Sequence, residues 1–313
     1  MNAYQKTAVA TVFATLFLIF VGGLVRGSGA GLGCPDWPKC WGCWVPPSNV
    51  SEIDATRYDV SKFNPTKMWI EYVNRLVGVT IGFLILATFI LSFSYRKTRP
   101  VVFKGSLLAL ILVLFQGWLG GMVVRSGLKT GMITVHLITA LILLCVLLFT
   151  TFRASSEKYS NWVSKIPDFK LIRLFRLWIV VTVIQIILGS QVREAVELVA
   201  RVVVAGEDRS GWISQVGVID HAHRLFSWAV FGIGIFAVRE IVRSQKESLA
   251  KKWAYTLIGF VVAQILFGIG MVYFAFPASF QVMHLTLASL LVAGQFWLLM
   301  VLTQARKYSR SAA

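Results

Sequence analysis

Long apolar runs are the feature that most limits how this chain can fold. Eight runs are each roughly twenty residues long, the length that a helix needs to cross a hydrocarbon core of about 30 Å. They are residues 8–26, 72–95, 103–124, 131–152, 171–192, 222–242, 253–275 and 281–304. Hydrophobic residues make up 57% of the 313-residue chain and charged residues 14%, too much apolar surface for a water-soluble globule to cover. We therefore predict an all-α integral membrane protein with eight transmembrane helices.

The first apolar run follows Lys6 and resembles a signal peptide. It is long, has no small-residue cleavage site before Val25, and is matched by a later segment of the chain. Secretory signals have a shorter apolar region that ends at such a site. We therefore expect this run to be a membrane-spanning helix.

The formal net charge of +17 indicates membrane topology and not nucleic-acid binding. Cytoplasmic loops of membrane proteins carry an excess of Lys and Arg. If the basic clusters share one side, both termini are cytoplasmic and the connections 27–70 and 193–221 lie outside a cell inner or plasma membrane. The basic residues of these clusters are Lys6, Arg96, Lys97, Arg99, Lys104, those within 153–176, Arg239, Arg243, Lys246, Lys251, Lys252, Arg306, Lys307 and Arg310.

The two halves of the chain repeat one pattern. Glu71–Leu76 (EYVNRL) matches Asp220–Leu225 (DHAHRL), and Val135–Ala140 (VHLITA) matches Met283–Ala288 (MHLTLA), with nearly equal spacing between the paired segments. Each half holds an even number of spans, so both halves have the same orientation. Two such copies are related by a pseudo-two-fold axis along the membrane normal.

The repeat predicts two tandem four-helix bundles, each able to hold a cofactor between facing helices. The N-terminal unit covers residues 1–152 and the C-terminal unit 171–313, with a cytoplasmic linker at 153–170.

Histidine occurs four times, always near the outer start of a predicted helix. His223 and His284 enter the second unit at the same depth, and His136 occupies the first-unit position equivalent to His284. Two imidazoles facing each other across a bundle suit axial ligation of haem iron, and ionisable groups inside a membrane favour a functional role. A zinc site is less favoured, because it needs four ligands and these helices carry no cysteine pair. His221 points to another face of its helix, and we expect it at the outer surface.

Asn74 breaks the symmetry, because it stands where the second unit has His223. An amide is a poor iron ligand, so the first unit offers one strong axial ligand and the second offers two. Glu71 shares a helical face with Asn74 and Arg75 and could move protons or stabilise positive charge beside a haem. An ion pair between Glu71 and Arg75 is the structural alternative.

Arg75 and Arg224 each directly follow a predicted ligand position. Both could pair with haem propionates or satisfy carbonyls at the outer face. An arginine that extends its head group to the membrane surface is the alternative.

Three of the four cysteines, Cys34, Cys40 and Cys43, lie close together in the first outer connection. An oxidising compartment permits a disulfide among them, but the residues alone do not select the pair. The remaining cysteine, Cys145, lies in an apolar run, where we expect a small buried side chain.

With these motifs the chain resembles the haem A synthase family, membrane enzymes that convert haem O to haem A for cytochrome oxidase assembly. The resemblance covers nearly the whole chain and is carried by an ordered set of motifs. They are Gly22–Arg26 (GGLVR), Gly29–Cys40 (GAGLGCPDWPKC), Glu71–Arg75 (EYVNR) and the histidines at 136, 223 and 284.

The resemblance implies a haem B cofactor ligated by His223 and His284, and a substrate haem O against His136 and the position of Asn74. It implies that Glu71 is catalytic and that Cys34 and Cys40 form the redox or structural pair. The family usually has histidine where this chain has Asn74.

The implied enzyme is an oxidoreductase acting on a CH or CH3 group. It oxidises a ring methyl to an aldehyde by successive hydroxylations, with oxygen taken from water. Haem O synthase is the implied upstream partner, an electron acceptor is required, and a homo-oligomer is an open alternative.

Two other functions stay open on the sequence. One is a dihaem b-type electron-transfer protein, although a pure electron carrier should keep two good ligands in each unit. The other is a non-catalytic haem-binding assembly factor. A transporter is less favoured, because the repeats are parallel and no paired broken helices interrupt the spans.

Overall fold

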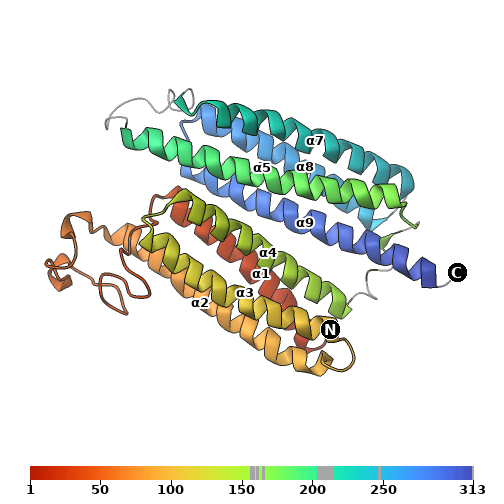
Figure 1. Cartoon of the computed structure of the whole chain (residues 1–313), viewed down its shortest axis with the longest axis horizontal. Coiled ribbons are helices and arrows are strands. Elements are labelled where there is room, and N and C mark those ends of the chain that lie inside the picture. Colours follow the sequence, from red (N-terminus) through yellow and green to blue (C-terminus); the bar gives the residue numbers. More distant parts are fainter. Residues whose placement is uncertain (156–158, 160–161, 164–165, 203–214, 246–247, 312–313) are drawn as a thin grey trace. The chain divides into compact units, whose positions relative to one another are not determined.

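Long α-helices form nearly all of the computed structural model (Figure 1). The structure describes residues 1–313 except 156–158, 160–161, 164–165, 203–214, 246–247 and 312–313. Within those residues there are no strands, and eight helices are long and apolar enough to cross a membrane. They are α1 Ala3–Gly27, α2 Pro65–Leu91, α3 Pro100–Arg125, α4 Thr130–Ser155, α5 Phe169–Val202, α7 Val218–Ser244, α8 Leu249–Tyr273 and α9 Ala278–Ser311. The predicted all-α class and number of spans are confirmed.

Polar caps extend several helices beyond their apolar runs. Asn2 and Gln5 form a capping box at the start of α1. The Asn64 side chain accepts from the backbone N–H of Lys67, and Pro65 follows as the first residue of α2. These groups satisfy N–H donors that the first turn of a helix cannot pair. Helix α2 therefore starts before the apolar run at residue 72, and both Glu71 and Asn74 lie inside the helix.

The apolar run predicts that the fifth helix ends at residue 192, with 193–221 as an outer connection. This prediction is wrong for 193–202, because α5 continues to Val202. Arg193 and Glu197 form an i,i+4 ion pair of 3.0 Å, which supports helix continuation. Charged residues ended the apolar pattern without ending the helix. The part of this connection at 203–214 lies outside the described residues.

The chain divides into two compact units, Met1–Leu147 and Leu148–Ala313. The division lies inside α4, a few residues before the boundary that we expected at 152. Part of the expected linker at 153–170 is outside the described residues, and so is Lys246 of the predicted basic clusters.

Unit 1 contains α1, α2, α3 and α4 up to Leu147 (Figure 1). Hydroxyl pairs join its helices in the interior: Tyr4 with Ser106 and Thr11 with Thr88, both at 2.9 Å. Interhelical hydrogen bonds of this kind hold helices together where lipid gives no hydrophobic driving force.

Unit 2 contains α5, α7, α8 and α9, packed around an apolar core. The largest fully buried side chain is Trp178 of α5, whose Nε1 donates to the carbonyl of Val230 at 3.0 Å. Gly234 of α7 lies against the same indole, and a Cβ there would come within 2.7 Å of it. A glycine is therefore required where the two helices approach.

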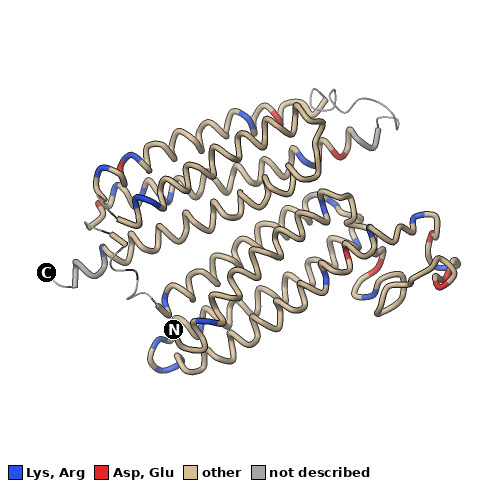
Figure 2. The backbone as a smooth tube through the Cα atoms, turned by 180° about the vertical axis from the view of Figure 1, so that it is seen from behind, with Lys and Arg blue, Asp and Glu red and all other residues tan. Residues whose placement is uncertain are grey.

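Apolar side chains also cover the outside of both units. Phe13, Phe83 and Leu114 of unit 1 are about two-thirds exposed, at 67%, 66% and 68%. In a soluble protein such a surface is a liability, whereas a lipid-facing helix requires it. Lys and Arg concentrate toward the ends of the helices (Figure 2).

Candidate functional site

His136 of α4 faces a glycine and a glutamine on α3. A Cβ built on Gly120 would lie 3.6 Å from Cε1 of the His136 ring. The side chain of Gln116 donates from Nε2 to the main-chain carbonyl of His136 at 3.0 Å. This bond fixes the position of α4 along α3, and Gly120, which has no side chain, leaves room for the His136 ring.

The same pairing recurs between α8 and α9 of unit 2. A Cβ on Gly268 would lie 3.7 Å from Cε1 of His284, and Gln264 Nε2 donates to the carbonyl of His284 at 2.7 Å. In both units the glutamine precedes its histidine by 20 residues.

His223 of α7 has an equivalent setting against α5. Gln185 Nε2 donates to the carbonyl of His223 at 3.0 Å. A Cβ on Gly189 would come within 2.9 Å of Cε1 of His223, closer than real Cβ contacts allow. The Gly189 position therefore has to be a glycine for this ring to stay where it is.

Asn74 of α2 occupies the position in unit 1 that corresponds to His223 in unit 2, and its surroundings differ from those of the three histidines. Its neighbour on α1 is Gly22, where a Cβ would lie 4.0 Å from Asn74 Oδ1. Leu18 precedes Gly22 by four residues, as Gln185 precedes Gly189. The corner of unit 1 formed by Gly22 and Asn74 therefore has no glutamine. Asn74 Oδ1 is buried and has no hydrogen-bond partner among the described residues.

The three histidines fit the ligation of a haem. Within the described residues, Nδ1 of His136, His223 and His284 is buried without a partner of hydrogen-bond geometry. No group of three or more His, Cys, Asp or Glu in the described part of the chain could hold a bare metal ion. A haem needs only one or two imidazoles, because its porphyrin supplies the other ligands.

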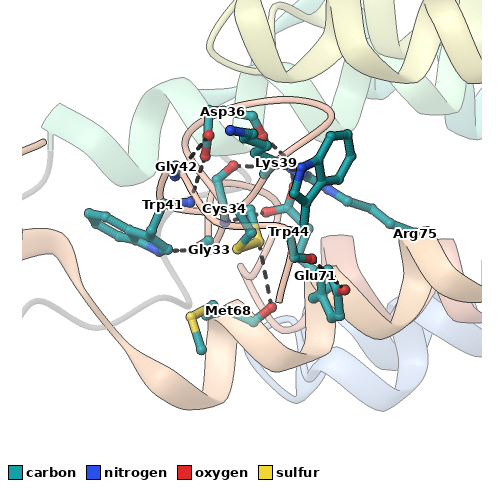
Figure 3. Close-up of a disulfide and its surroundings, with 12 residues drawn as sticks. Gly33, Cys34, Asp36, Lys39, Trp41, Gly42, Trp44, Met68, Glu71 and Arg75 are labelled. Carbon is teal, nitrogen blue, oxygen red and sulfur yellow. Dashed lines mark hydrogen bonds and ion pairs between the residues drawn. A yellow bond between two sulfur atoms is a disulfide. The ribbon is translucent and has the colours of Figure 1, made fainter. Parts of the chain in front are cut away.

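Glu71 and Arg75 bind each other one turn apart on α2, with N–O distance 2.5 Å. Arg75 Nη1 also donates to the carbonyls of Asp36 and Lys39, each at 2.8 Å, and Nη2 to that of Cys34 at 3.2 Å. Glu71 is buried, and its Oε2 accepts from the backbone N–H of Cys34 at 2.9 Å. Figure 3 shows the pair directly beneath the folded loop.

Two of the interactions expected for Arg75 are therefore present, namely the ion pair with Glu71 and hydrogen bonds to backbone carbonyls, which here belong to the loop. Arg224 occupies the equivalent position in α7, where its Nε lies 2.8 Å from Asp220 Oδ2. Its side chain is 52% exposed, against 13% for Arg75. Arg75 is therefore enclosed by Glu71 and the loop, whereas Arg224 is half-exposed.

The loop above Glu71 is held by a disulfide between Cys34 and Cys40, the pair implied by the resemblance. Both cysteines are fully buried with Trp41 and Met68. Cys43 is a free, half-buried thiol whose backbone exchanges two hydrogen bonds with that of Cys40.

Asp36 organises the turn that carries the disulfide (Figure 3). Its carboxylate accepts from the backbone N–H of Trp41 at 2.6 Å and of Gly42 at 3.0 Å, and from the hydroxyl of Tyr58 at 3.2 Å. Burial and the Asp36 charge together raise the pKa of Tyr58 above its usual 10.0.

Among the remaining predicted residues, His221 is exposed at the start of α7, with Nδ1 3.2 Å from the carbonyl of Gly217. It lies apart from the His223 setting, as its helical position predicts. Cys145 is a half-buried free thiol in α4.

Sequence reasoning missed the three glutamines and Asp36. A signal for two of the glutamines exists, because Gln116 and Gln264 repeat at the same spacing from their histidines. Asp36 lies inside a quoted motif, but its contacts depend on a loop fold that the spacing does not reveal.

Comparisons with known proteins agree along the length of the chain. The family model described as cytochrome oxidase assembly protein matches residues 5–296. A protein of Shewanella oneidensis named Heme A synthase is 26% identical, over 90% of this chain and 91% of its own. One of the same name from Bacillus licheniformis is 24% identical, over 98% of each chain. A third, from Bartonella tribocorum, is 23% identical, over 87% of this chain and 85% of its own.

Proposed function

Because this chain belongs to the haem A synthase family of cytochrome oxidase assembly proteins, we propose that it oxidises the ring methyl of haem O to the formyl group of haem A. The family makes the chain a multi-pass membrane enzyme of haem biosynthesis. The observation that carries the proposal for its own residues is the set of three histidines whose Nδ1 atoms are buried, each set against a glycine of the neighbouring helix.

The proposed reaction converts –CH3 and one water to –CHO with release of four protons and four electrons. Two successive hydroxylations followed by loss of water satisfy this balance. The electrons pass to an external acceptor. Both termini are proposed to be cytoplasmic, with the haem sites near the outer face and haem O synthase acting upstream.

The second unit is proposed to hold the cofactor. A haem B ligated by His223 and His284 would supply one-electron transfer. Gln185 and Gln264 hold the main chain of these two residues against the neighbouring helices. The glycines behind the rings keep the imidazoles from being displaced.

The first unit is proposed to bind haem O against His136, beside Asn74. Glu71 lies one helical turn from Asn74, where a fixed carboxylate can stabilise positive charge that develops on the substrate. Its bonds to Arg75 and to the N–H of Cys34 are those of an ionised carboxylate. We therefore assign Glu71 an electrostatic role in the oxidation, with proton transfer as a second use of the same group.

Production of haem A in a host that supplies haem O tests the function. The full-length chain should yield haem A, or a hydroxylated intermediate, among the haems extracted and separated by chromatography. Absence of both from a host in which the protein accumulates with bound haem would contradict the proposal.

Glu71→Gln is the discriminating variant, with Asp220→Asn at the equivalent position of unit 2 as its control. For the enzyme, Glu71→Gln should lower haem A yield strongly while the haem content stays near normal. Asp220 pairs with a half-exposed arginine, so its variant should keep most of the activity. An electron carrier or an assembly factor would keep its haem spectrum and its role in both variants.

A further inference from the structure

The two units present four corresponding positions, and one of them lacks an iron ligand. We propose that His136 is the only side chain of unit 1 that would ligate the haem iron, and that the Asn74 carbonyl would accept a hydrogen bond from a water bound to that iron. The inference rests on the proposed haem O site and adds the ligand that this site takes on its open side.

The Asn74 side chain is too short to reach an iron that a histidine at the same position would ligate. In histidine the ligating Nε2 is two bonds beyond Cγ, whereas both amide atoms of asparagine are one bond beyond Cγ. The space around Asn74 is also wider, because a Cβ on Gly22 would lie 4.0 Å from its Oδ1, against 2.9 Å from Gly189 to the His223 ring. The shorter Asn74 side chain therefore leaves a gap, relative to a histidine, that a small molecule would fill.

The unpaired oxygen of Asn74 indicates what kind of small molecule would bind beside it. Asn74 Oδ1 is an acceptor that is buried and unpaired within the described residues. Leaving such a group without a donor is costly, so the site favours a ligand that carries an O–H or N–H. A water bound to iron and to Asn74 would have two polar partners, which is enough to hold it.

Neighbouring side chains do not supply the missing donor. Both Glu71 oxygens are acceptors already used by Arg75 and by the N–H of Cys34. Arg75 directs its guanidinium to Glu71 and to the loop carbonyls. Leu18 stands where unit 2 has Gln185 and carries no polar group. None of these three side chains donates to Asn74 Oδ1, so a ligand that carries a donor would satisfy it.

The spin state of the ferric haems tests the proposal in the purified full-length protein. We expect electron paramagnetic resonance to show a low-spin component from His223 and His284, and a second component that is high-spin or water-ligated. The second component should disappear in His136→Ala. Two bis-histidine low-spin haems in the wild-type protein, or no haem that depends on His136, would overturn the proposal.

Exchanging the corner residues between the units sharpens the test. Asn74→His should convert the second component to bis-histidine low-spin, because Gly22 leaves at least as much room as Gly189. His223→Asn should give the haem of unit 2 the signature that unit 1 has in the wild type. An unchanged spin state in Asn74→His, in protein that retains its haem, would contradict the inference.

Asn74→Leu separates the amide from mere empty space, since leucine is similar in size and has no acceptor. The intensity of the exchangeable-proton signal of bound water, measured by electron–nuclear double resonance in H2O and D2O, should fall roughly 5-fold, because loss of one hydrogen bond weakens water binding by about that factor. A signal intensity equal to the wild type would overturn the role of Asn74. These readouts need no turnover: haem A formed by a protein with two low-spin haems refutes this inference alone, and the expected spectra without haem A refute only the proposed reaction.

Discussion

The backbone N–H of Cys34 donates to Oε2 of Glu71 at 2.9 Å, so the disulfide loop and helix α2 share one buried carboxylate. Arg75 closes the arrangement by binding the other oxygen of Glu71 and the carbonyl of Cys34. Any movement of the loop therefore changes the surroundings of Glu71. The loop 28–64 is thereby coupled to Glu71, although it is far from the histidines along the chain.

Arg75→Ala should destabilise the protein far more than Arg224→Ala. Removing one partner of a buried ion pair costs about 3–5 kcal/mol, and three loop carbonyls lose their donor as well. The Arg224 pair is half-exposed, and exposed pairs contribute about 1 kcal/mol or less. Thermal unfolding of the two purified variants measures the difference, and equal losses would show that the loop contacts of Arg75 contribute nothing.

Thiol labelling should separate the three loop cysteines. Trypsin cleavage after Lys39 places Cys34 on one peptide and Cys40 with Cys43 on the next. In the native protein a maleimide should modify Cys43, which is half-buried, and leave the disulfide pair untouched. Mass spectrometry should find the two peptides joined before reduction, and a link within the second peptide would contradict the Cys34–Cys40 pairing.

Cys34→Ser with Cys40→Ser should lower both stability and activity. A short disulfide loop contributes about 2 kcal/mol by the chain-entropy estimate, and Cys34 also carries the N–H bound to Glu71. The control is Cys43→Ser, which removes a free thiol and should leave both values close to the wild type. Haem A yield and thermal unfolding of each variant provide the measurements.

The stability of the loop 28–64 should fall in alkaline solution because of Tyr58. Its pKa is raised in the folded chain by burial and by Asp36, from a usual 10.0, so folding favours the protonated phenol. The stabilisation is complete below pH 10 and is lost as pH rises through the folded pKa. Tyr58→Phe should flatten the decline in unfolding temperature above pH 10, and an unchanged decline would assign it to other groups.

The sequence predicts the helices well because each apolar run has to span a membrane, and length alone then identifies it. The histidine positions follow from the repeat, and the fold places His136, His223 and His284 at comparable settings on facing helices. The end of α5 was not predictable from hydropathy, since Arg193 and Glu197 interrupt the apolar pattern while stabilising the helix.

The loop contacts could not be derived from spacing either. Arg75 had four open interpretations, because which carbonyls it contacts depends on how residues 34–40 fold back onto α2. The disulfide pair became a specific expectation only through the resemblance, because three cysteines lie close together in one loop.

Gly189 of unit 2 and Gly22 of unit 1 occupy corresponding positions and give a selective mutational comparison, because the room for an added Cβ differs between them. A Cβ at Gly189 would come within 2.9 Å of the His223 ring, a contact that forces the imidazole or α5 to move. A Cβ at Gly22 would stand 4.0 Å from Asn74 and meet ordinary van der Waals contact. We expect Gly189→Ala to shift or abolish the low-spin signal of unit 2 and to lower the haem-to-protein ratio. Gly22→Ala should leave both haem signals in place and should stabilise α1 by up to about 1 kcal/mol through helix propensity. Pyridine haemochrome assays with electron paramagnetic resonance of both variants decide the matter, because equal effects of the two substitutions would mean that the ring of His223 does not pack against Gly189.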